Sequence, residues 1–448
     1  MFNKVLIANR GEIAVRVIRA CRELGISTVA VYSEADREAL HTQIADEAIC
    51  IGPSRAKDSY LNMGNLISAA VLTGAQGIHP GFGFLSENST FAKMCRECNI
   101  KFIGPDPETI DLMGDKSRAR EIMIKAGVPV IPGTEGTVGT LEEVLENGKR
   151  IGFPLMIKAA SGGGGKGIRI VKEEKELESA YLSAKSEAKA SFGDDRVYME
   201  RFIQNPRHIE VQILGDNYGN IIHLGERDCS LQRRNQKVLE ESPSKVLDDE
   251  LRKKMGETAI KAAKVVNYKN AGTIEFLLDK NGEFYFMEMN TRIQVEHPVT
   301  EMVTGVDLVK EQIKIASGIK LSLKQKDIKI KGHAIECRIN AENPERNFAP
   351  SPGKIEFLFL PGGNNVRVDT AVYNGYIIPP YYDSMLGKVI VYGKDRKEAI
   401  EKMKTALWEI TIDGVDTNVD FQLEILNNIK YMEGEFHTGF IEKEILKK

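Results

Sequence analysis

The dipeptide Asn-Gly at 281–282, the strongest signal for a two-residue type I′ hairpin loop, separates two apolar runs and constrains this chain more than any other feature. With such a loop, Lys280 faces Glu283 across the turn. Counting outward along both strands then places Glu275 directly opposite Glu288. Two carboxylates in direct cross-strand contact repel each other unless a cation lies between them. The hairpin therefore predicts a site for a divalent metal ion.

The second strand of this hairpin continues a polar pattern at every other position. If the segment stays extended, these polar side chains project from one face, and Met289, Ile293 and Val295 project from the other. The polar positions are Glu288, Asn290, Arg292, Gln294 and Glu296. A solvated strand face would give the same alternation. We favour a metal site that leads into an anion site, because Glu275 interrupts an apolar strand and an arginine, an amide and a carboxylate follow at a fixed period.

The composition bounds the class of protein. With 42% hydrophobic and 28% charged residues it is typical of a globular chain, and 448 residues predict about three domains of roughly 150 residues each. The net charge of −3 argues against a general role in binding nucleic acid or a membrane surface. No apolar run approaches the roughly 18 residues that span a bilayer. We therefore expect a cytoplasmic protein.

The N-terminal segment predicts a parallel sheet. An apolar run at 4–8 precedes a helical pattern at 9–25, and a second apolar run follows at 27–32. No glycine-rich dinucleotide fingerprint follows the first strand, and Ser86 replaces the third glycine in the later HPGFGFLSEN, so a nicotinamide dehydrogenase is disfavoured. His79 and Glu87 in that loop are candidates to line a site, although a structural loop is equally compatible with these residues.

Four consecutive glycines at 162–165 are the second strong signal. The segment SGGGGKG lies between an apolar strand pattern and the strand-like IRIV, so it matches neither a Rossmann turn, which opens a helix, nor a Walker loop, in which Ser or Thr follows the lysine. A glycine loop between two strands is a flexible flap whose backbone amides approach phosphate oxygens closely. Lys158, on the strand that enters the loop, adds a positive charge for the same phosphates. A disordered surface loop is the alternative, but the acidic metal ligands downstream favour nucleotide binding.

A polar loop is expected at 229–243, where the sequence is CSLQRRNQKVLEESP. Its basic residues Arg233, Arg234 and Lys237 fit a strip that binds anions. A solvated charged loop is the alternative.

Several long motifs together resemble one family. They are IANRGEIAVRVIRA, HPGFGFLSEN, SGGGGKG, ERDCSLQRRNQKV, EMNTRIQVEHPVTE, AIECRINAE and PPYYDSMLGK. The chain resembles the biotin carboxylases, members of the ATP-grasp superfamily, over essentially its whole length. It is most similar to the stand-alone biotin carboxylase subunit of bacterial acetyl-CoA carboxylase. Because the motifs are long, chance similarity is negligible.

The resemblance implies an ATP-grasp fold, which is a multidomain α/β and α+β architecture. A Rossmann-like, doubly wound parallel-sheet domain is expected at 1–113, and a mobile glycine-flap lid at 131–203. The part that binds nucleotide and metal is expected at 204–330, and a C-terminal mixed-sheet domain at 331–448.

The resemblance also implies a role for individual residues of this sequence. ATP would be bound by Lys116, Lys158, Gly164, Gly165, Glu200, Arg201, Phe202, Ile203, His208, Asn235, Glu275 and Glu288. Mg²⁺ or Mn²⁺, as two ions, would be held by Glu275, Glu288 and Asn290. Bicarbonate would be bound by Lys237, Arg292, Gln294 and the backbone of Val295. The catalytic residues would be Glu296 as the base, Lys237, Arg292 and Arg338, the last also meeting the ureido group of biotin.

The implied activity is that of a ligase. Glu296 would deprotonate bicarbonate for attack on ATP, and the resulting carboxyphosphate would supply carbon dioxide to biotin, with Arg338 stabilising the ureido oxygen. Biotin would arrive on a separate biotin carboxyl carrier protein, because Met403-Lys404 lies in a helical pattern rather than at a hairpin tip. Carboxyltransferase subunits and a second copy of the chain are the other expected partners. The final acceptor would be acetyl-CoA, for malonyl-CoA and fatty-acid synthesis, with pyruvate or propionyl-CoA as alternatives.

Two positions depart from the family pattern. Asn235 stands where histidine is frequent, and asparagine cannot become positively charged, which puts its contact with the nucleotide in doubt. Lys166 stands where arginine is common, a change tolerated at a point contact with phosphate. A non-biotin ATP-grasp ligase should lack the set of Arg292, Glu296 and Arg338, and a non-catalytic nucleotide-binding regulator should lose the metal ligands and the base.

Overall fold

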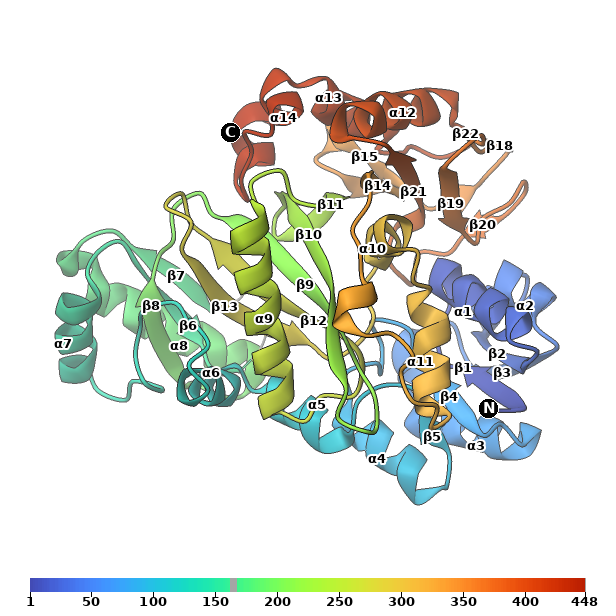
Figure 1. Ribbon diagram of the computed structural model, residues 1–448, viewed down its shortest axis with the longest axis horizontal. Coiled ribbons are helices and arrows are strands. Elements are labelled where there is room, and N and C mark those ends of the chain that lie inside the picture. Colours follow the sequence, from blue (N-terminus) through green and yellow to red (C-terminus); the bar gives the residue numbers. More distant parts are fainter. Residues whose placement is uncertain (162–166, 448) are drawn as a thin grey trace.

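The computed structural model describes residues 1–161 and 167–447. Three sheets, of five, three and eight strands, organise these residues (Figure 1). One lies in the N-terminal part, a small one carries the glycine-rich connection, and an eight-stranded sheet runs through the middle of the molecule into the C-terminal part. Within the described ranges, none of the helices has both the length and the apolar character needed to cross a membrane.

A five-stranded parallel sheet with helices on both faces forms the N-terminal part, in the strand order β3-β2-β1-β4-β5. Its elements are β1 (Lys4–Ile7), α1 (Gly11–Glu23), β2 (Ser27–Ser33), α2 (Leu40–Ile44), β3 (Glu47–Gly52), α3 (Met63–Thr73), β4 (Gly77–His79), α4 (Ser89–Glu97), β5 (Lys101–Phe102) and α5 (Pro107–Gly114). Val5 and Ile7 pack with α1, whereas Leu6 packs with α3 and α4 on the other face. The predicted parallel strand-helix-strand unit is confirmed, and its strands are apolar because both faces are covered.

A smaller antiparallel sheet, here called the lid sheet, lies at the opposite end of the molecule in the order β7-β6-β8 (Figure 1). Its strands are β6 (Leu155–Ala159), β7 (Ile168–Val171) and β8 (Val197–Arg201). The helices of this part are α7 (Leu141–Ile151) and α8 (Leu177–Phe192), and α6 (Lys116–Lys125) precedes it in the chain. Because β6 and β7 pair with Lys158 opposite Ile168, the glycine-rich segment joins two strands, as predicted. The predicted phosphate contacts Gly164 and Gly165 lie outside the described residues.

The eight-stranded sheet has the order β13-β12-β9-β10-β11-β14-β21-β19 and is antiparallel. Its strands are β9 (Arg207–Gly215), β10 (Ile221–Arg233), β11 (Gln236–Ser242), β12 (Asn270–Leu278), β13 (Phe284–Asn290), β14 (His333–Asn340), β19 (Val366–Thr370) and β21 (Met385–Gly393). The helices around it are α9 (Asp249–Val265), α10 (His297–Thr304), α11 (Leu308–Ala316), α12 (Arg396–Glu409), α13 (Val419–Asn427) and α14 (Ile429–Glu433). Short strand pairs complete the C-terminal part: β15 (Glu342–Asn343) with β16 (Ala349–Pro350), β17 (Gly353–Lys354) with β20 (Ile377–Ile378), and β18 (Phe357–Phe359) with β22 (Thr411–Asp413).

The two faces of this sheet have different chemistry. In β9, Ile209 and Val211 pack into the apolar core beneath α9. His208 and Glu210 alternate with them and are also buried, so they occupy the opposite face. The expected fold class is confirmed, with one correction: the C-terminal strands pair in antiparallel fashion rather than as a mixed sheet. The domain boundaries remain predictions.

The hairpin of β12 and β13 reaches the predicted register by a different route. Glu275 is the cross-strand partner of Glu288, as predicted. The predicted two-residue loop is wrong, because Asp279 donates its backbone N–H to the carbonyl of Glu283 at 2.8 Å and three residues lie between them. The expected pairing of Lys280 with Glu283 is therefore absent from this part of the structure.

A β-bulge compensates for the longer loop. Phe276 pairs with Phe286, and the next pair along the strands is Glu275 with Glu288. Met287 is thus an extra residue on β13, and the register shifts by one position at this point. The extra residue in the loop shifts the register by one position, and the extra residue in the bulge shifts it back. The predicted pairing of the two carboxylates is therefore correct.

The predicted polar loop at 229–243 is also wrong. Strand β10 extends to Arg233, β11 begins at Gln236, and the two strands pair in antiparallel fashion. Arg234 and Asn235 form the connection with φ of +50° and +64°, as a two-residue type I′ turn requires. Part of the segment's polar character lies inside the protein, where Ser230 and Gln232 are buried, whereas Arg234 and Asn235 at the turn are exposed.

Gly282 has φ of +82° and open space around its Cα, so replacement by alanine tests the backbone conformation alone. We expect Gly282→Ala to destabilise the hairpin by about 1 kcal/mol, since a Cβ disfavours the left-handed region. Gly282→Asn is the matched control, and it should cost less because asparagine tolerates that region. Urea denaturation followed by circular dichroism measures the difference, and equal stability of the two variants would contradict this account.

Candidate active site

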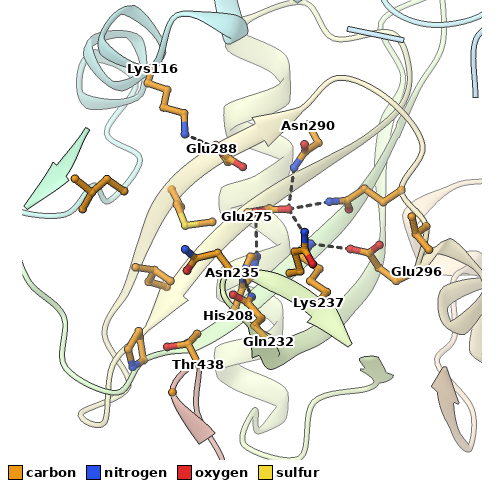
Figure 2. Close-up of a pocket in the computed structure, with 18 of the residues that line it drawn as sticks. Lys116, His208, Gln232, Asn235, Lys237, Glu275, Glu288, Asn290, Glu296 and Thr438 are labelled. Atoms are coloured by element: carbon orange, nitrogen blue, oxygen red, sulfur yellow. Dashed lines mark hydrogen bonds and ion pairs between the residues drawn. The ribbon is translucent and has the colours of Figure 1, made fainter. Parts of the chain in front are cut away.

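A cavity of about 1050 Å³ opens between the lid sheet and the polar face of the large sheet (Figure 2). Every residue that the family resemblance assigned to the site and that the structure describes lines it, whereas the other candidates His79, Glu87, Arg233 and Arg234 do not. The assigned residues that line it are Lys116, Lys158, Glu200, Arg201, Phe202, Ile203, His208, Asn235, Lys237, Glu275, Glu288, Asn290, Arg292, Gln294, Val295, Glu296 and Arg338. They come from α6, from the lid sheet, from strands of the large sheet and from the turn between β13 and α10, so the fold brings together residues more than two hundred positions apart.

Glu275 is a buried carboxylate of the cavity that accepts three hydrogen bonds from side chains (Figure 2). Its Oε1 accepts from Lys237 Nζ at 3.0 Å and from the side-chain amides of Asn290 and Gln294 at 2.8 Å each. His208 Nε2 lies 3.0 Å from the other carboxylate oxygen. Burial alone raises the pKa of Glu275, but Lys237 and the His208 ring outweigh it and hold that pKa well below its ordinary value.

The two opposed carboxylates, Glu275 and Glu288, form ion pairs with different lysines. Glu275 contacts Lys237, whereas Glu288 Oε2 lies 3.0 Å from Nζ of Lys116 at the start of α6. Glu275, Glu288 and Asn290 all line the cavity, and Glu288 keeps about one third (34%) of its side chain exposed. Carboxylate and amide oxygens are the ligands that Mg²⁺ prefers. The donor set therefore fits a magnesium ion.

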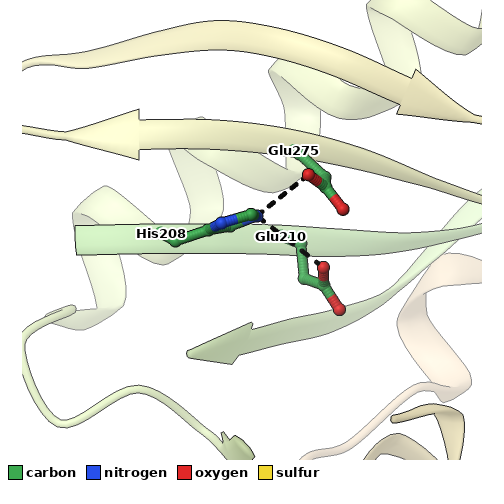
Figure 3. Close-up of side chains that lie close together, drawn as sticks. All are labelled: His208, Glu210 and Glu275. Carbon is green, nitrogen blue, oxygen red and sulfur yellow. Dashed lines mark ion pairs between the residues drawn. The ribbon is translucent and has the colours of Figure 1, made fainter. Parts of the chain in front are cut away.

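Lys237 lies at the centre of the buried charges. Its Nζ is 2.6 Å from Glu210, 3.0 Å from Glu275 and 2.7 Å from Glu296. Burial lowers the pKa of this lysine, but the three carboxylates raise it well above its ordinary value. Figure 3 shows two of these carboxylates beside His208, whose Nε2 is 4.0 Å from Glu210. The ammonium is thus a fixed positive charge that keeps three acids in one cluster.

Glu296 is a buried carboxylate between two cations. One of its oxygens accepts from Lys237 Nζ at 2.7 Å, and the other accepts from the Arg338 guanidinium at 2.9 Å. Burial raises the pKa of Glu296, but Lys237, Arg338 and Arg227 together hold it well below the ordinary value. Arg338 also donates to Glu240 at 2.7 Å, and burial raises the pKa of that acid to about 7 despite the guanidinium. Glu296 is therefore an ionised carboxylate, the form that can accept a proton, at this end of the cavity.

The strand β13 ends at Asn290, so the expectation of an extended segment through Glu296 is wrong. The chain turns instead, and α10 begins directly after Glu296 with a proline in its first turn. This turn directs the side chain of Gln294 back to Glu275, and it leaves Glu296 at the N-terminus of a helix. The predicted polar residues share one site, but a turn rather than strand alternation gathers them.

The loop that contains HPGFGFLSEN borders the site, because Phe82 lines the cavity and Glu87 contacts two residues of the turn after β13. Glu87 accepts from Arg292 Nε at 2.8 Å and from the backbone N–H of Thr291 at 3.0 Å. Arg292 also donates to Oδ1 of Asn290 at 2.9 Å. His79 is fully buried, and its Nδ1 accepts from the backbone of a glycine two residues on. Of these two candidates, Glu87 holds a site arginine and His79 stabilises its own loop.

The residues near the lid sheet form the other end of the cavity. Lys158 on β6 forms an ion pair with Glu200 on β8. Arg201 ends β8, and Phe202 and Ile203 follow it on the way to β9. Asn235 reaches the cavity from the turn between β10 and β11.

Comparison with known proteins agrees with this arrangement. Family models match residues 1–110 (biotin carboxylase, N-terminal domain), 115–324 (carbamoyl-phosphate synthase L chain, ATP binding domain) and 336–443 (biotin carboxylase C-terminal domain). Biotin carboxylase 1 of Bacillus subtilis is 60% identical over 443 residues, which cover 99% of this chain and 98% of the relative. The chain belongs to the biotin carboxylase family. The resemblance implied by the motifs is confirmed.

Solved biotin carboxylase structures have the same fold. A biotin carboxylase complex from Campylobacter jejuni superposes with a TM-score of 0.96 at 52% identity and covers 99% of both chains. The biotin carboxylase domain dimer of Hydrogenobacter thermophilus 2-oxoglutarate carboxylase gives a TM-score of 0.95 at 51% identity over 99% of this chain and 98% of that one. That structure was solved with MgADP, ADP and bicarbonate.

The sequence analysis did not predict Arg227, a buried cation that contacts residues of this biotin carboxylase site. Arg227 on β10 is fully buried and donates to Glu210 Oε1 at 2.5 Å and to Gln294 Oε1 at 2.7 Å. It also donates to Gln212, Thr273 and Thr300. Alternating polar residues within the apolar strand RHIEVQILG were the available signal, because they mark a strand with one buried polar face. Tyr198, Arg120, Gln232 and Thr438 line the cavity as well.

Replacing Arg227 tests this buried network. Arg227→Met keeps the length of the side chain but leaves the buried Glu210 with less compensation, so we expect a loss of about 3–5 kcal/mol in unfolding free energy. Arg252→Met is the control, because Arg252 pairs with Glu226 at 2.9 Å on a side chain that is 22% exposed. Water can replace the Arg252 guanidinium beside Glu226 more easily, so we expect the unfolding free energy to fall by only about 1 kcal/mol. Urea denaturation compares the two variants, and equal losses would contradict the role assigned to the network.

Proposed function

We propose that this chain carboxylates biotin on a biotin carboxyl carrier protein, with ATP and bicarbonate as the other substrates. The observation that carries the proposal is Glu296, a buried and ionised carboxylate between Lys237 and Arg338. A base flanked by an anion-binding cation on one side and a second cation on the other is what a bicarbonate-activating ligase requires. A non-biotin ATP-grasp ligase has no need of this set.

ATP occupies the end of the cavity near the lid sheet. Lys116 and Lys158 supply the positive charge for its phosphates, and Glu200, Arg201, Phe202, Ile203, His208 and Asn235 surround the remainder. The volume of about 1050 Å³ supports a ligand of nucleotide size. The backbone amides of Gly164 and Gly165 are proposed to cover the phosphates and exclude water, which would otherwise hydrolyse the reactive intermediate.

Glu275, Glu288 and Asn290 would hold Mg²⁺ or Mn²⁺, as two ions. Bound there, the metal would neutralise charge on the phosphate oxygens and so favour attack at the γ-phosphorus. The structure from Hydrogenobacter thermophilus was solved with MgADP, which supports magnesium as the ion.

Bicarbonate binds where Lys237, Arg292, Gln294 and the backbone of Val295 meet. Glu296 then accepts the bicarbonate proton, and the oxygen freed in this way attacks the γ-phosphoryl group of ATP. The products of that step are ADP and carboxyphosphate. Because Lys237 is shared among three carboxylates, an arriving anion competes for the same ammonium. Any withdrawal of Lys237 from Glu296 raises the pKa of that acid and makes it a stronger base.

Arg338 acts on biotin. Carboxyphosphate breaks down to carbon dioxide and phosphate, and the phosphate accepts the proton of the biotin N1 atom. The guanidinium stabilises the negative charge that develops on the ureido oxygen, after which N1 attacks carbon dioxide. Glu240 and Glu296 support this role, because each accepts a hydrogen bond from Arg338 and holds its planar group in place.

Acetyl-CoA is the proposed final acceptor, which makes the reaction the first half of malonyl-CoA and fatty-acid synthesis in the cytoplasm. Carboxyltransferase subunits and a second copy of the chain are the proposed partners. Pyruvate is the second candidate, because a pyruvate carboxylase subunit from Methanothermobacter thermautotrophicus is 55% identical over 443 residues. Identification of the carboxyltransferase that co-purifies with the chain separates the two, whereas propionyl-CoA has no observation in its favour.

The activity and its base are tested together by ATP hydrolysis with and without bicarbonate, and with and without free biotin. Wild-type protein should release ADP when bicarbonate is present. Glu296→Gln should lower that rate by about 10²–10⁴-fold, the usual contribution of a general base, while ADP still binds. Glu311→Gln, a buried acid on α11 outside the cavity, is the matched control and should keep the wild-type rate. Unchanged turnover of Glu296→Gln would refute the base assignment.

Arg338→Gln separates the two half-steps. Carboxybiotin formation should fall by about 10²–10³-fold, as for the loss of an oxyanion donor, and binding of ADP should change little. Arg338→Lys keeps the charge but not the planar fork, so an intermediate rate is expected. Transfer of labelled bicarbonate to biotin measures the first quantity, and calorimetry measures the second. Equal losses of carboxylation and nucleotide binding would count against the role of Arg338.

A further inference from the structure

Lys388 on β21 is a fully buried lysine beside the site that lines no part of the cavity. Its Nζ donates to the backbone carbonyl of Val295 and lies 3.1 Å from Oε1 of Glu12 on α1. On the sheet, Lys388 is the cross-strand partner of Arg338, so the two side chains share the polar face. One ammonium therefore touches the N-terminal part, the large sheet and the turn that precedes α10.

That turn is held at two successive carbonyls. The carbonyl of Gln294 accepts from the backbone N–H of His297 at 3.3 Å and from Nδ1 of the same residue at 2.8 Å. A carbonyl only accepts, so Nδ1 carries the proton, and burial holds the pKa of His297 well below its ordinary value. Lys388 holds the next carbonyl, that of Val295. The peptide between Val295 and Glu296 thus has a fixed orientation.

We propose that Lys388 is a positioning residue of the bicarbonate site, because it anchors the peptide that joins Val295 to the base Glu296. The inference rests on the proposed function, which assigns bicarbonate to this turn. A charged donor holds a carbonyl more firmly than a neutral one. Small displacements matter here, since a site must keep its groups within about 0.5 Å of the productive geometry. Rotation of this peptide would move the Glu296 carboxylate, and through the ψ angle of Val295 it would also disturb the preceding peptide, which carries the Val295 N–H.

The simpler role for Lys388 is to neutralise Glu12 where the N-terminal part meets the sheet. Neither oxygen of Glu12 has a hydrogen-bond partner among the described residues, so the two groups form an ion pair at 3.1 Å without a well-aligned hydrogen bond. The aligned hydrogen bond of Lys388 goes to Val295 instead. The two roles predict different behaviour of a Glu12 variant.

The test compares Lys388→Met with Glu12→Gln in the full chain. Bicarbonate-dependent ATP hydrolysis is measured with bicarbonate varied at saturating ATP, and then with ATP varied at saturating bicarbonate. For Lys388→Met we expect KM for bicarbonate to rise about tenfold and kcat to fall by a similar factor, while KM for ATP stays within about twofold. Glu12→Gln keeps the donor to Val295 and should change each value by less than about twofold. Lys388→Arg keeps a charged donor and should recover part of the bicarbonate KM.

Two results would overturn the inference. One is a folded Lys388→Met protein with the wild-type KM for bicarbonate, and the other is a Glu12→Gln protein that shows the same loss, which would assign Lys388 to charge neutralisation. If Lys388→Met does not fold, the double variant with Glu12→Gln removes both buried charges and is measured in its place, with the same expected KM. Wild-type protein without bicarbonate-stimulated hydrolysis would instead refute the proposed function.

Discussion

The ammonium group of Lys237 is the interaction on which the site depends. It lies within 3.0 Å of Glu210, Glu275 and Glu296, all of which are buried. Each ion loses its hydration on burial, at a cost of several kcal/mol, and three neighbouring carboxylates also repel one another. A single cation among them offsets both effects, and the pKa values of Glu275 and Glu296 stay low as a result. The acids are thus ionised and aligned before any substrate binds.

The surrounding fold extends this balance of charge. Arg227 on β10 contacts Glu210, and Arg338 on β14 contacts Glu296. Both arginines lie on the polar face of the eight-stranded sheet, which the helix α9 does not cover. The face opposite is apolar, and Glu210, Lys237, Glu275 and both arginines lie on strands, whereas Glu296 lies on the turn that precedes α10. Strands hold side chains more precisely than loops, as a site needs if its hydrogen bonds are to stay in place during catalysis.

Two β-bulges decide which side chains reach the cluster. Leu231 pairs with Leu239, and the next pair is Gln232 with Lys237, so one residue of β11 is skipped. Without that bulge, Lys237 would share the apolar face with Leu239. The bulge in β13 acts similarly, because it restores Glu275 to a position opposite Glu288 after a longer loop. Neither bulge leaves a clear mark in the sequence, since a bulge depends on the neighbouring strand as much as on its own residues.

The sequence by itself determined the family, the fold class and the residue types of the site, because long motifs and the alternation of apolar and polar residues are local properties. It also predicted the opposed pair Glu275 and Glu288, although through a loop that is one residue too short. Only the tertiary structure decided that Lys237 and Lys116 bind different members of that pair, and that a turn rather than a strand brings Gln294 back to Glu275. The contact between the buried Arg227 and Glu210 was also visible only in the tertiary structure. The physical reason is that these contacts join strands distant in the chain, and their geometry follows from packing and charge compensation, which no local pattern contains.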